Sequence, residues 1–237
     1  MRVLKVVVEG MVTSFRYPHF LVGIHPTYEI PPPATIYGHV CSAVGEFISP
    51  DATQFAYHFT YEARFKDYEH LHFFSQKAAS ADRAKMSPQT RELLFKPQLT
   101  LYLSNTDLLP YFRSPFYPVI LGRAQDLMTY TRVEIIELQR AEQAFYTGTL
   151  LTLMQSAQIG GHSFAVQMPR YIDENRRTYW GQYAVLPDEK GVSPVIYPTT
   201  GSLDFGNMDI WIDPEADARH PYKKELQRGV IWHDWTD

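Results

Sequence analysis

Cysteine is almost absent from this chain of 237 residues, which contains only Cys41. A single thiol has no partner within the chain, so the fold is predicted to form without internal disulfides. Cys41 lies in an apolar helical pattern, where a lone cysteine is more often a small packing residue than a nucleophile. We therefore expect it in the core rather than at a catalytic centre.

Long apolar runs are also missing. No segment approaches the roughly 18 consecutive apolar residues of a membrane-spanning helix, and the N-terminal MRVLKVVVEG is too short an apolar stretch for a signal peptide. We expect a cytoplasmic protein without a membrane partner. The content of 45% hydrophobic and 14% aromatic residues is nevertheless sufficient for a sizeable core.

Positive charge is not in excess, because 22 Lys and Arg residues face 26 Asp and Glu residues, a formal net charge of −4. This balance argues against a general nucleic-acid coat protein, whose affinity depends on neutralising many phosphates. Charge is unevenly distributed, since residues 63–96 are net basic whereas residues 203–217 carry only acids. A local basic surface therefore remains compatible with RNA binding.

The common signatures of metal and cofactor sites are missing as well. His70-Leu71-His72 has no third ligand at a suitable spacing, and GGHS at 160–163 lacks the lysine of a phosphate-binding loop. We predict no metal and no cofactor. Tyr37 and His39, with histidines in the preceding loop, offer the general acid and base of metal-independent RNA cleavage, and this is the catalytic alternative.

Three consecutive prolines precede the first predicted helix. Proline suits the lead-in and first turn of a helix because it fixes φ and lacks an N–H group. Apolar residues from Ile36 to Ile48 then recur at helical spacing, and Pro50 with Asp51 is expected to end the helix. The unpaired N–H groups at its start suit an anionic ligand; Thr35 either takes part in that site or caps the turn.

Alternating or β-branched patterns predict strands on both sides of this helix. After a buried strand at 3–9 comes a long irregular loop, 10–32, and the remaining predicted strands are 55–65, 98–104 and 133–139. A short helix near 105–112, with Asn105 or Thr106 as its cap, precedes the last strand. The order β-α-β-β-(short α)-β predicts an α+β, ferredoxin-like domain over 1–140, followed by a smaller β-rich lobe over 141–237.

Arginine and aromatic residues alternate on two loops beside this predicted sheet. Such a mixture is typical of single-stranded RNA binding, where guanidinium groups contact phosphate and rings stack on bases. The candidate RNA-binding residues on the loops, together with Thr35 at the helix, are Ser14, Arg16, Tyr17, His19, Arg113, Arg123 and Gln125.

Two motifs in this order, TYEIPPPATIYGHVCSAVGE and PVILGRAQDLM, resemble the CRISPR-associated RAMP family that caps type I Cascade complexes. The resemblance covers residues 1–140; beyond them, PRYID (169–173) and RTYWGQY (177–183) match the family's second lobe only loosely. It implies an RRM-type ferredoxin-like domain with a projecting β-hairpin thumb at about 66–96. Arg123 becomes the leading contact candidate, followed by Arg16 and His19, and the thumb candidates are Lys77, Arg83 and Lys85.

The family resemblance also implies a function. Its members bind the 5′ handle of the CRISPR RNA and cap the filament of backbone subunits, so the expected partners are CRISPR RNA, the Cascade backbone and large subunits, and target DNA through the complex. The I-C branch cuts precursor RNA with a Tyr, a Lys and a His, but this chain has no matching Lys-His pair in its later strands. We expect a non-catalytic, I-B-like subunit, with endoribonuclease activity as the alternative. An RRM-type regulator outside CRISPR systems would carry an aromatic RNP signature, which the predicted strands lack.

Overall fold

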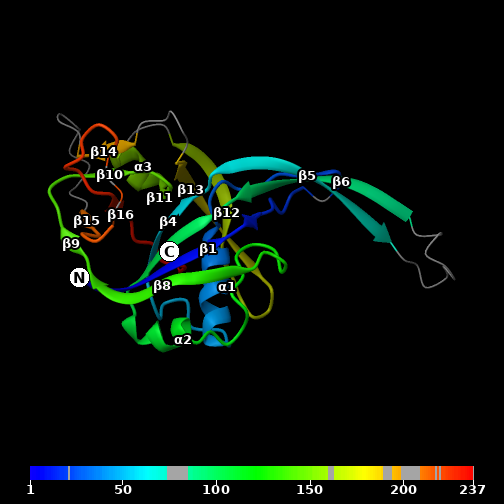
Figure 1. Ribbon diagram of the computed structural model, residues 1–237, viewed down its shortest axis with the longest axis horizontal. Coiled ribbons are helices and arrows are strands. Elements are labelled where there is room, and N and C mark those ends of the chain that lie inside the picture. Colours follow the sequence, from blue (N-terminus) through cyan, green and yellow to red (C-terminus); the bar gives the residue numbers. More distant parts are fainter. Residues whose placement is uncertain are drawn as a thin grey trace.

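The computed structural model describes residues 1–20, 22–73, 85–159, 163–188, 194–198, 209–216, 218 and 220–236, with the backbone alone at 71, 73, 85 and 86. The described chain is a mixed α+β structure that consists mostly of strands, with few helices (Figure 1). None of its described helices is long and apolar enough to cross a membrane.

The central sheet contains four antiparallel strands in the spatial order β4-β7-β1-β8. Helix α1 (Pro33–Val44) follows β1, and a 3-10 turn (Thr106–Leu108) with helix α2 (Leu109–Arg113) lies between β7 and β8. Asn105 caps that turn, as predicted, by accepting a hydrogen bond from the Asp107 N–H at 3.0 Å. The strands are β1 (Arg2–Gly10), β4 (Phe55–Thr60), β7 (Gln98–Leu103) and β8 (Met128–Glu137).

Both faces of this sheet are covered. On one face Leu4, Val6 and Leu101 belong to the main core with α1. On the other face Val3 and Tyr102 belong to a second cluster together with residues of the C-terminal segment. Because successive side chains of a strand point to opposite faces, the continuous apolar run in β1 reflects burial on both sides.

Hydrogen bonds to the carbonyl groups of the three prolines fix the chain where it enters α1. Tyr57 Oη donates to the Pro31 carbonyl at 2.6 Å, and Trp235 Nε1 donates to the Pro33 carbonyl at 3.0 Å. The Pro32 carbonyl accepts from the Thr35 N–H at 2.8 Å, so Pro32 is the N-cap residue and Thr35 does not cap the turn with its side chain. The prolines therefore join the start of α1 to β4 and to the C-terminal segment.

Helix α1 ends earlier than its apolar spacing predicts. Gly45, with φ of +95°, follows Val44 in the left-handed conformation, and its N–H donates to the Cys41 carbonyl at 2.8 Å. Glycine adopts this conformation without steric cost and is the usual residue after a helix end. The apolar residues Phe47 and Ile48 lie beyond that point, so the prediction of an end at Pro50 was wrong.

Strands β5 (Ala63–Phe73) and β6 (Lys85–Phe95) pair antiparallel as a long hairpin that projects from the rest of the molecule (Figure 1). The loop at 10–32 was expected to be irregular, yet it contains two short strands that pair with β6, namely β2 (Val12–Thr13) and β3 (Ile24–His25). Their pairing depends on a partner some 65 or more residues away in the chain, which a local sequence pattern cannot reveal.

The second half of the chain packs on the first. Strand β12 lies against α1, where the Tyr37 and Tyr171 rings meet edge to face at 4.8 Å, and Val185 and Trp235 enter the main core. The predicted division at residue 140 remains a prediction. The elements here are β9 (Gln139–Arg140), β10 (Ala144–Tyr146), β11 (Thr149–Thr152), α3 (Leu153–Ile159), β12 (Phe164–Ile172), β13 (Thr178–Leu186), β14 (Val195–Tyr197), β15 (Trp211–Ile212) and β16 (Gly229–Val230).

Buried His233 predicts an acid-sensitive fold. Its Nε2 lies 3.0 Å from the Leu150 carbonyl, and burial lowers its pKa to about 4. Unfolded histidine has a pKa near 6.5, so between about pH 6.5 and pH 4 the unfolded chain binds the extra proton. Stability is fully present above pH 6.5, and this residue alone removes up to about 3 kcal/mol as the pH falls to 4.

Urea unfolding at several pH values between 4 and 7 measures this effect. His233→Gln should flatten the pH dependence of the unfolding free energy, although it also lowers stability at every pH. His70→Gln, at an exposed position on β5, is the matched control for the substitution itself. Equal slopes for the two variants would contradict the assignment.

Candidate nucleic-acid interface

A cavity of about 450 Å³ lies where the first loop, the start of α1, the turn at 121–126 and strand β12 meet. Five of the eight predicted RNA-binding residues line it, although they come from three separate segments of the chain. They are Ser14, Arg16, Thr35, Arg123 and Gln125.

The electrostatics of this cavity favour an anion. Three guanidinium groups, of Arg16, Arg91 and Arg123, line it, and its lining contains no carboxylate. The first turn of α1 opens into it through Ala34 and Thr35, and no described side chain caps that helix end. Pro33 has no N–H group, and the Thr35 and Ile36 N–H groups donate to the Pro32 carbonyl, so the attraction of this end for negative charge comes chiefly from the helix dipole.

Ser14 gives a second, independent indication of a ligand. The residue is 3% exposed and lines the cavity, yet its hydroxyl has no hydrogen-bond partner among the described residues. Buried polar groups are nearly always paired, because leaving one unpaired costs about 1–3 kcal/mol. A phosphate oxygen in the cavity would satisfy this hydroxyl.

The Leu-Gly-Arg segment is explained by close packing against the first loop. Gly122 has a φ of +98°, and a Cβ atom there would lie 2.8 Å from the Ser14 carbonyl oxygen. Leu121 is buried, and its carbonyl accepts a hydrogen bond from the Thr13 hydroxyl. Only glycine permits both this backbone conformation and this approach, so the motif holds the turn at 121–126 against the loop that carries Ser14 and Arg16.

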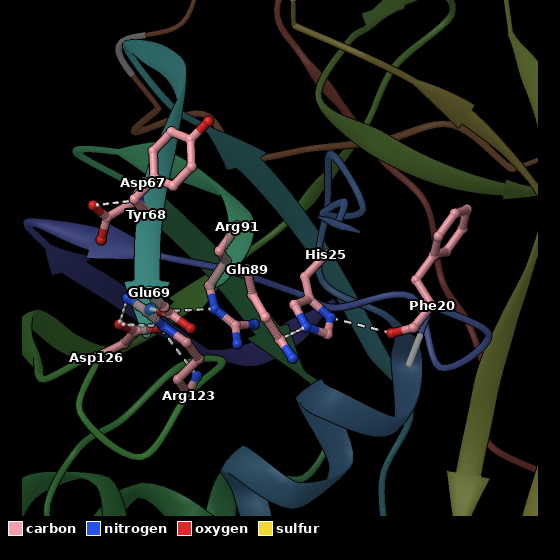
Figure 2. Close-up of polar contacts among 9 residues, drawn as sticks. All are labelled: Phe20, His25, Asp67, Tyr68, Glu69, Gln89, Arg91, Arg123 and Asp126. Carbon is pink, nitrogen blue, oxygen red and sulfur yellow. Dashed lines mark hydrogen bonds and ion pairs between the residues drawn. The ribbon is translucent and has the colours of Figure 1, made fainter. Parts of the chain in front are cut away.

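Arg123 is fixed by two carboxylates at the base of the hairpin (Figure 2). Its guanidinium forms a fork with Asp126, with an Nη2 to Oδ1 distance of 2.8 Å, and its Nη1 donates to Glu69 at 2.9 Å. Burial alone lowers the pKa of Arg123, but the bonds and charges of Asp126 and Glu69 outweigh it and raise the pKa overall. Arg91 Nε also donates to Glu69, at 2.8 Å.

This network joins the turn at 121–126 to both hairpin strands, because Glu69 belongs to β5 and Arg91 to β6. Arg16 is exposed and forms no ion pair with a described residue. Because no described carboxylate pairs with it, the Arg16 guanidinium is the most available of the three cavity arginines to bind a phosphate. Arg123, by contrast, both lines the cavity and anchors the hairpin.

His25 fastens the first loop to the hairpin at a second point (Figure 2). Its Nδ1 lies 3.1 Å from the Phe20 carbonyl, and its Nε2 contacts the side-chain oxygen of Gln89 on β6. Both His25 and Gln89 are buried. The loop that supplies Ser14 and Arg16 is therefore held in a defined position beside the cavity.

The other predicted loop residues lie outside the cavity lining. Tyr17 is half-buried and packs on Tyr28 with ring centroids 3.7 Å apart, and burial is the main cause of its raised pKa. His19 is exposed and stacks on Trp180 of β13. Arg113 is the last residue of α2, is exposed, and does not join the cavity group.

Tyr37 and His39, the catalytic alternative, have different hydrogen-bond partners. The Tyr37 hydroxyl donates to the Ile48 carbonyl, and burial is the main cause of its raised pKa. His39 Nδ1 lies 2.9 Å from the Ile120 carbonyl, its Nε2 lies 3.1 Å from the Tyr130 hydroxyl, and burial lowers its pKa. Both residues are buried in the core and satisfied by partners there.

The structure describes the thumb candidates only in part. Lys77 and Arg83 lie outside the described residues, and Lys85 is the first residue of β6, of which only the backbone is described. Within the described part of the chain, no group of three or more His, Cys, Asp or Glu residues is arranged to hold a metal ion.

Several site residues escaped the sequence analysis. Arg91 and Glu69 were part of the general basic segment without individual roles, and Pro169 and Ile172 of β12 complete the cavity wall. Trp180 was noted only within RTYWGQY. The mixture of arginine and aromatic residues in that stretch is the same signal that marked the first loop.

Comparisons with known proteins give a likeness of fold. No family model and no curated protein sequence matches this chain. A chain of a CRISPR RNA-guided surveillance complex is similar in structure, with a TM-score of 0.53 and 13% identity over 80% of this chain and 94% of that chain. A chain of the type III-B Cmr-beta complex bound to cognate target RNA and AMPPnP has a TM-score of 0.50 and 10% identity, over 83% of this chain and 86% of that one. The shared fold is thus that of subunits found in RNA-guided CRISPR assemblies.

Proposed function

We propose that this chain is a non-catalytic subunit of a type I, I-B-like CRISPR Cascade, which binds the 5′ handle of the CRISPR RNA and caps the backbone filament. The observation that carries the proposal is the anion-binding cavity, where three arginines, the uncapped start of α1 and the unpaired Ser14 hydroxyl converge. A cavity of this size, open to solvent, suits the backbone of a single RNA strand.

The fold supports the same proposal. The strand order β4-β7-β1-β8, with helices after the first and third of these strands along the chain, fits a ferredoxin-like domain. Hairpin β5–β6 corresponds to the proposed thumb, although it begins at Ala63 rather than at residue 66. The likeness to a chain of a CRISPR RNA-guided surveillance complex supports a CRISPR context. The proposed partners are crRNA, the backbone and large subunits, and target DNA through the complex. Such a complex works in the cytoplasm.

Handle-dependent assembly tests this function. We expect the chain to join its backbone and large subunits on a guide RNA with the native 5′ handle, and to be lost when the handle is scrambled. The reason is that splayed single-stranded bases are read on their edges as well as through their phosphates. Native mass spectrometry of the two assemblies measures the difference, and a guide with a scrambled spacer is the control. Equal incorporation on both handles would refute the proposal.

We propose no catalytic role for Tyr37 and His39, because each is buried and hydrogen-bonded within the core. The same preparations can be incubated with repeat RNA in EDTA. Cleavage at a single position by the wild-type chain, lost in His39→Ala, would replace this proposal with the endoribonuclease alternative.

A further inference from the structure

Two rings from distant parts of the chain form an exposed stack beside the cavity. His19 of the first loop and Trp180 of β13 have ring centroids 5.5 Å apart and an interplanar angle of 18°. Trp180 is 36% exposed, and His19 is exposed as well. A solvent-facing tryptophan is costly to leave uncovered, which makes such a surface a candidate contact site.

The register of the β12–β13 pair places this stack on the cavity side. Trp180 lies directly opposite Pro169 in the antiparallel ladder, and Pro169 lines the cavity. Side chains of directly opposed residues share a face of the sheet. The first loop approaches the same place from the other side, since Arg16 lines the cavity and His19 follows three residues later.

We propose that the His19–Trp180 pair is a stacking platform for one base of the bound RNA strand, whose backbone phosphate lies in the cavity. This inference rests on the proposed function, because it assigns the RNA-binding site a base contact in addition to its phosphate contacts. A base continues the existing stack of rings, while Arg16 and Ser14 contact the phosphate. Stacking on an aromatic ring tolerates any base, so this position contributes affinity rather than sequence choice.

Charge favours RNA over a protein partner on this surface. Of the three arginines that line the cavity next to the rings, Arg91 and Arg123 pair with Glu69 and Asp126, which leaves the Arg16 guanidinium available. Rings beside guanidinium groups are the usual composition of single-stranded nucleic-acid sites. Tyr179, the neighbour of Trp180 in β13, points to the opposite face of the strand and stacks on Tyr171 with ring centroids 5.6 Å apart, so it is not part of this surface.

Fluorescence anisotropy with a labelled single-stranded RNA carrying the repeat-derived 5′ end tests the platform on the full chain. Trp180→Leu should weaken binding roughly 5- to 150-fold, the range typical of one base stacked on an aromatic residue. Trp180→Phe should retain most of the affinity. His19→Ala, at an exposed loop position, should also weaken binding and serves as a second variant if Trp180→Leu does not fold.

A scan with one abasic nucleotide at a time identifies the stacked base. One position should weaken binding to the wild type but not to Trp180→Leu, because the variant has already lost that contact. Tyr222→Leu, at an 83% exposed aromatic residue outside the cavity lining, is the control and should bind as the wild type does.

The failures of the two proposals are distinguishable. If the wild type binds the RNA and both Trp180→Leu and His19→Ala bind it equally well, the platform is refuted and the handle-binding function stands. If these variants bind RNA normally but no longer co-purify with the backbone subunit, the rings form a protein contact and the platform is again refuted. If the wild type does not bind the RNA at all, both proposals fail.

Discussion

Replacing Arg123 by alanine is expected to lower the free energy of unfolding by about 2–4 kcal/mol and to weaken RNA retention at the same time. Removal of one partner of a largely buried ion pair leaves the other as an uncompensated charge. Here that charge is Asp126, whose side chain is 2% exposed, and Glu69 loses one of its two arginine partners. Urea unfolding measures the first effect, and anisotropy with handle RNA measures the second.

Arg16→Ala is the matched comparison for Arg123→Ala. Arg16 lines the same cavity but is exposed and has no described ion pair, so its loss should change stability by less than about 0.5 kcal/mol. It should still weaken RNA binding by about 1–3 kcal/mol, as expected for one charge-assisted or stacked contact. The double variant Arg123→Met with Asp126→Asn should recover part of the stability lost by Arg123→Ala. If Arg123→Ala proves as stable as Arg16→Ala, the anchoring role of Arg123 is wrong.

Arg16 and Arg123 differ in how much of their role could be predicted from the sequence. Arg16 and Arg123 were both predicted as RNA contacts, since arginine on loops beside a sheet suits phosphate, and both line the cavity. The anchoring of Arg123 could not be predicted, because it depends on Glu69, some 54 residues earlier in the chain. Ion pairs between distant segments leave no local periodicity or motif.

For the other elements, too, local sequence explains some features, and contacts between distant segments explain the rest. The proline entry of α1 follows from the chemistry of Pro31 to Pro33, and the strands of the central sheet follow from apolar patterning. The predicted strand 55–65 was wrong in its extent, because β4 ends at Thr60 and a separate strand, β5, begins at Ala63, and β8 begins at Met128 rather than at residue 133. The end of α1 was misplaced because apolar spacing continued to Ile48, whereas Gly45 in the left-handed conformation decides the end locally. The pairing of His19 with Trp180 lies beyond any local signal, since the two residues are distant in sequence and meet only because the β12–β13 pair packs on the first half of the chain.

Tyr37 and His39 are close in sequence but do not share surroundings in the fold. Residue types suited to acid–base chemistry stood close together in sequence, which favoured a catalytic alternative. In the fold they contact different partners, Tyr171 and Trp235 for Tyr37, and Phe112 and Tyr130 for His39. Residues two positions apart in a helix do not face each other, so proximity in sequence was a poor guide to a shared site.

Lys5→Met is the second change with a large expected effect, about 3–5 kcal/mol of lost stability. The Lys5 ammonium pairs with Asp213, and the side chains are 4% and 1% exposed. The Tyr102 hydroxyl also donates to Asp213, at 2.9 Å. Without Lys5, the buried carboxylate loses its ion-pair partner, and the more distant buried Arg228 is the remaining cation that interacts with it among the described residues.

The double variant Lys5→Met with Asp213→Asn should restore part of the lost stability, because the asparagine still accepts from Tyr102 and carries no charge, whereas buried Arg228 loses the favourable charge of Asp213. Arg140→Met is the control from the same part of the fold. Like the Lys5–Asp213 pair, the Arg140–Asp209 pair connects a strand to the C-terminal segment, in this case β9. Its side chains are 68% and 63% exposed, so Arg140→Met should lower the free energy of unfolding by about 1 kcal/mol or less. Equal losses for Lys5→Met and Arg140→Met in urea unfolding would show that burial does not decide the strength of this link.

The Lys5 pair also bears on which face binds RNA. Asp213 holds the C-terminal segment over the sheet face that carries Tyr102, so that face is occupied within the chain itself. RRM domains stack bases on aromatic residues of an open sheet, and here the C-terminal segment covers Tyr102 on that face, while a cavity lined by Val7 and Thr100 remains on the same face. Lys5→Met at a urea concentration below the unfolding transition should therefore leave RNA affinity unchanged, provided that RNA binds at the cavity beside α1. A gain in affinity on loosening this segment would instead locate the RNA on the sheet.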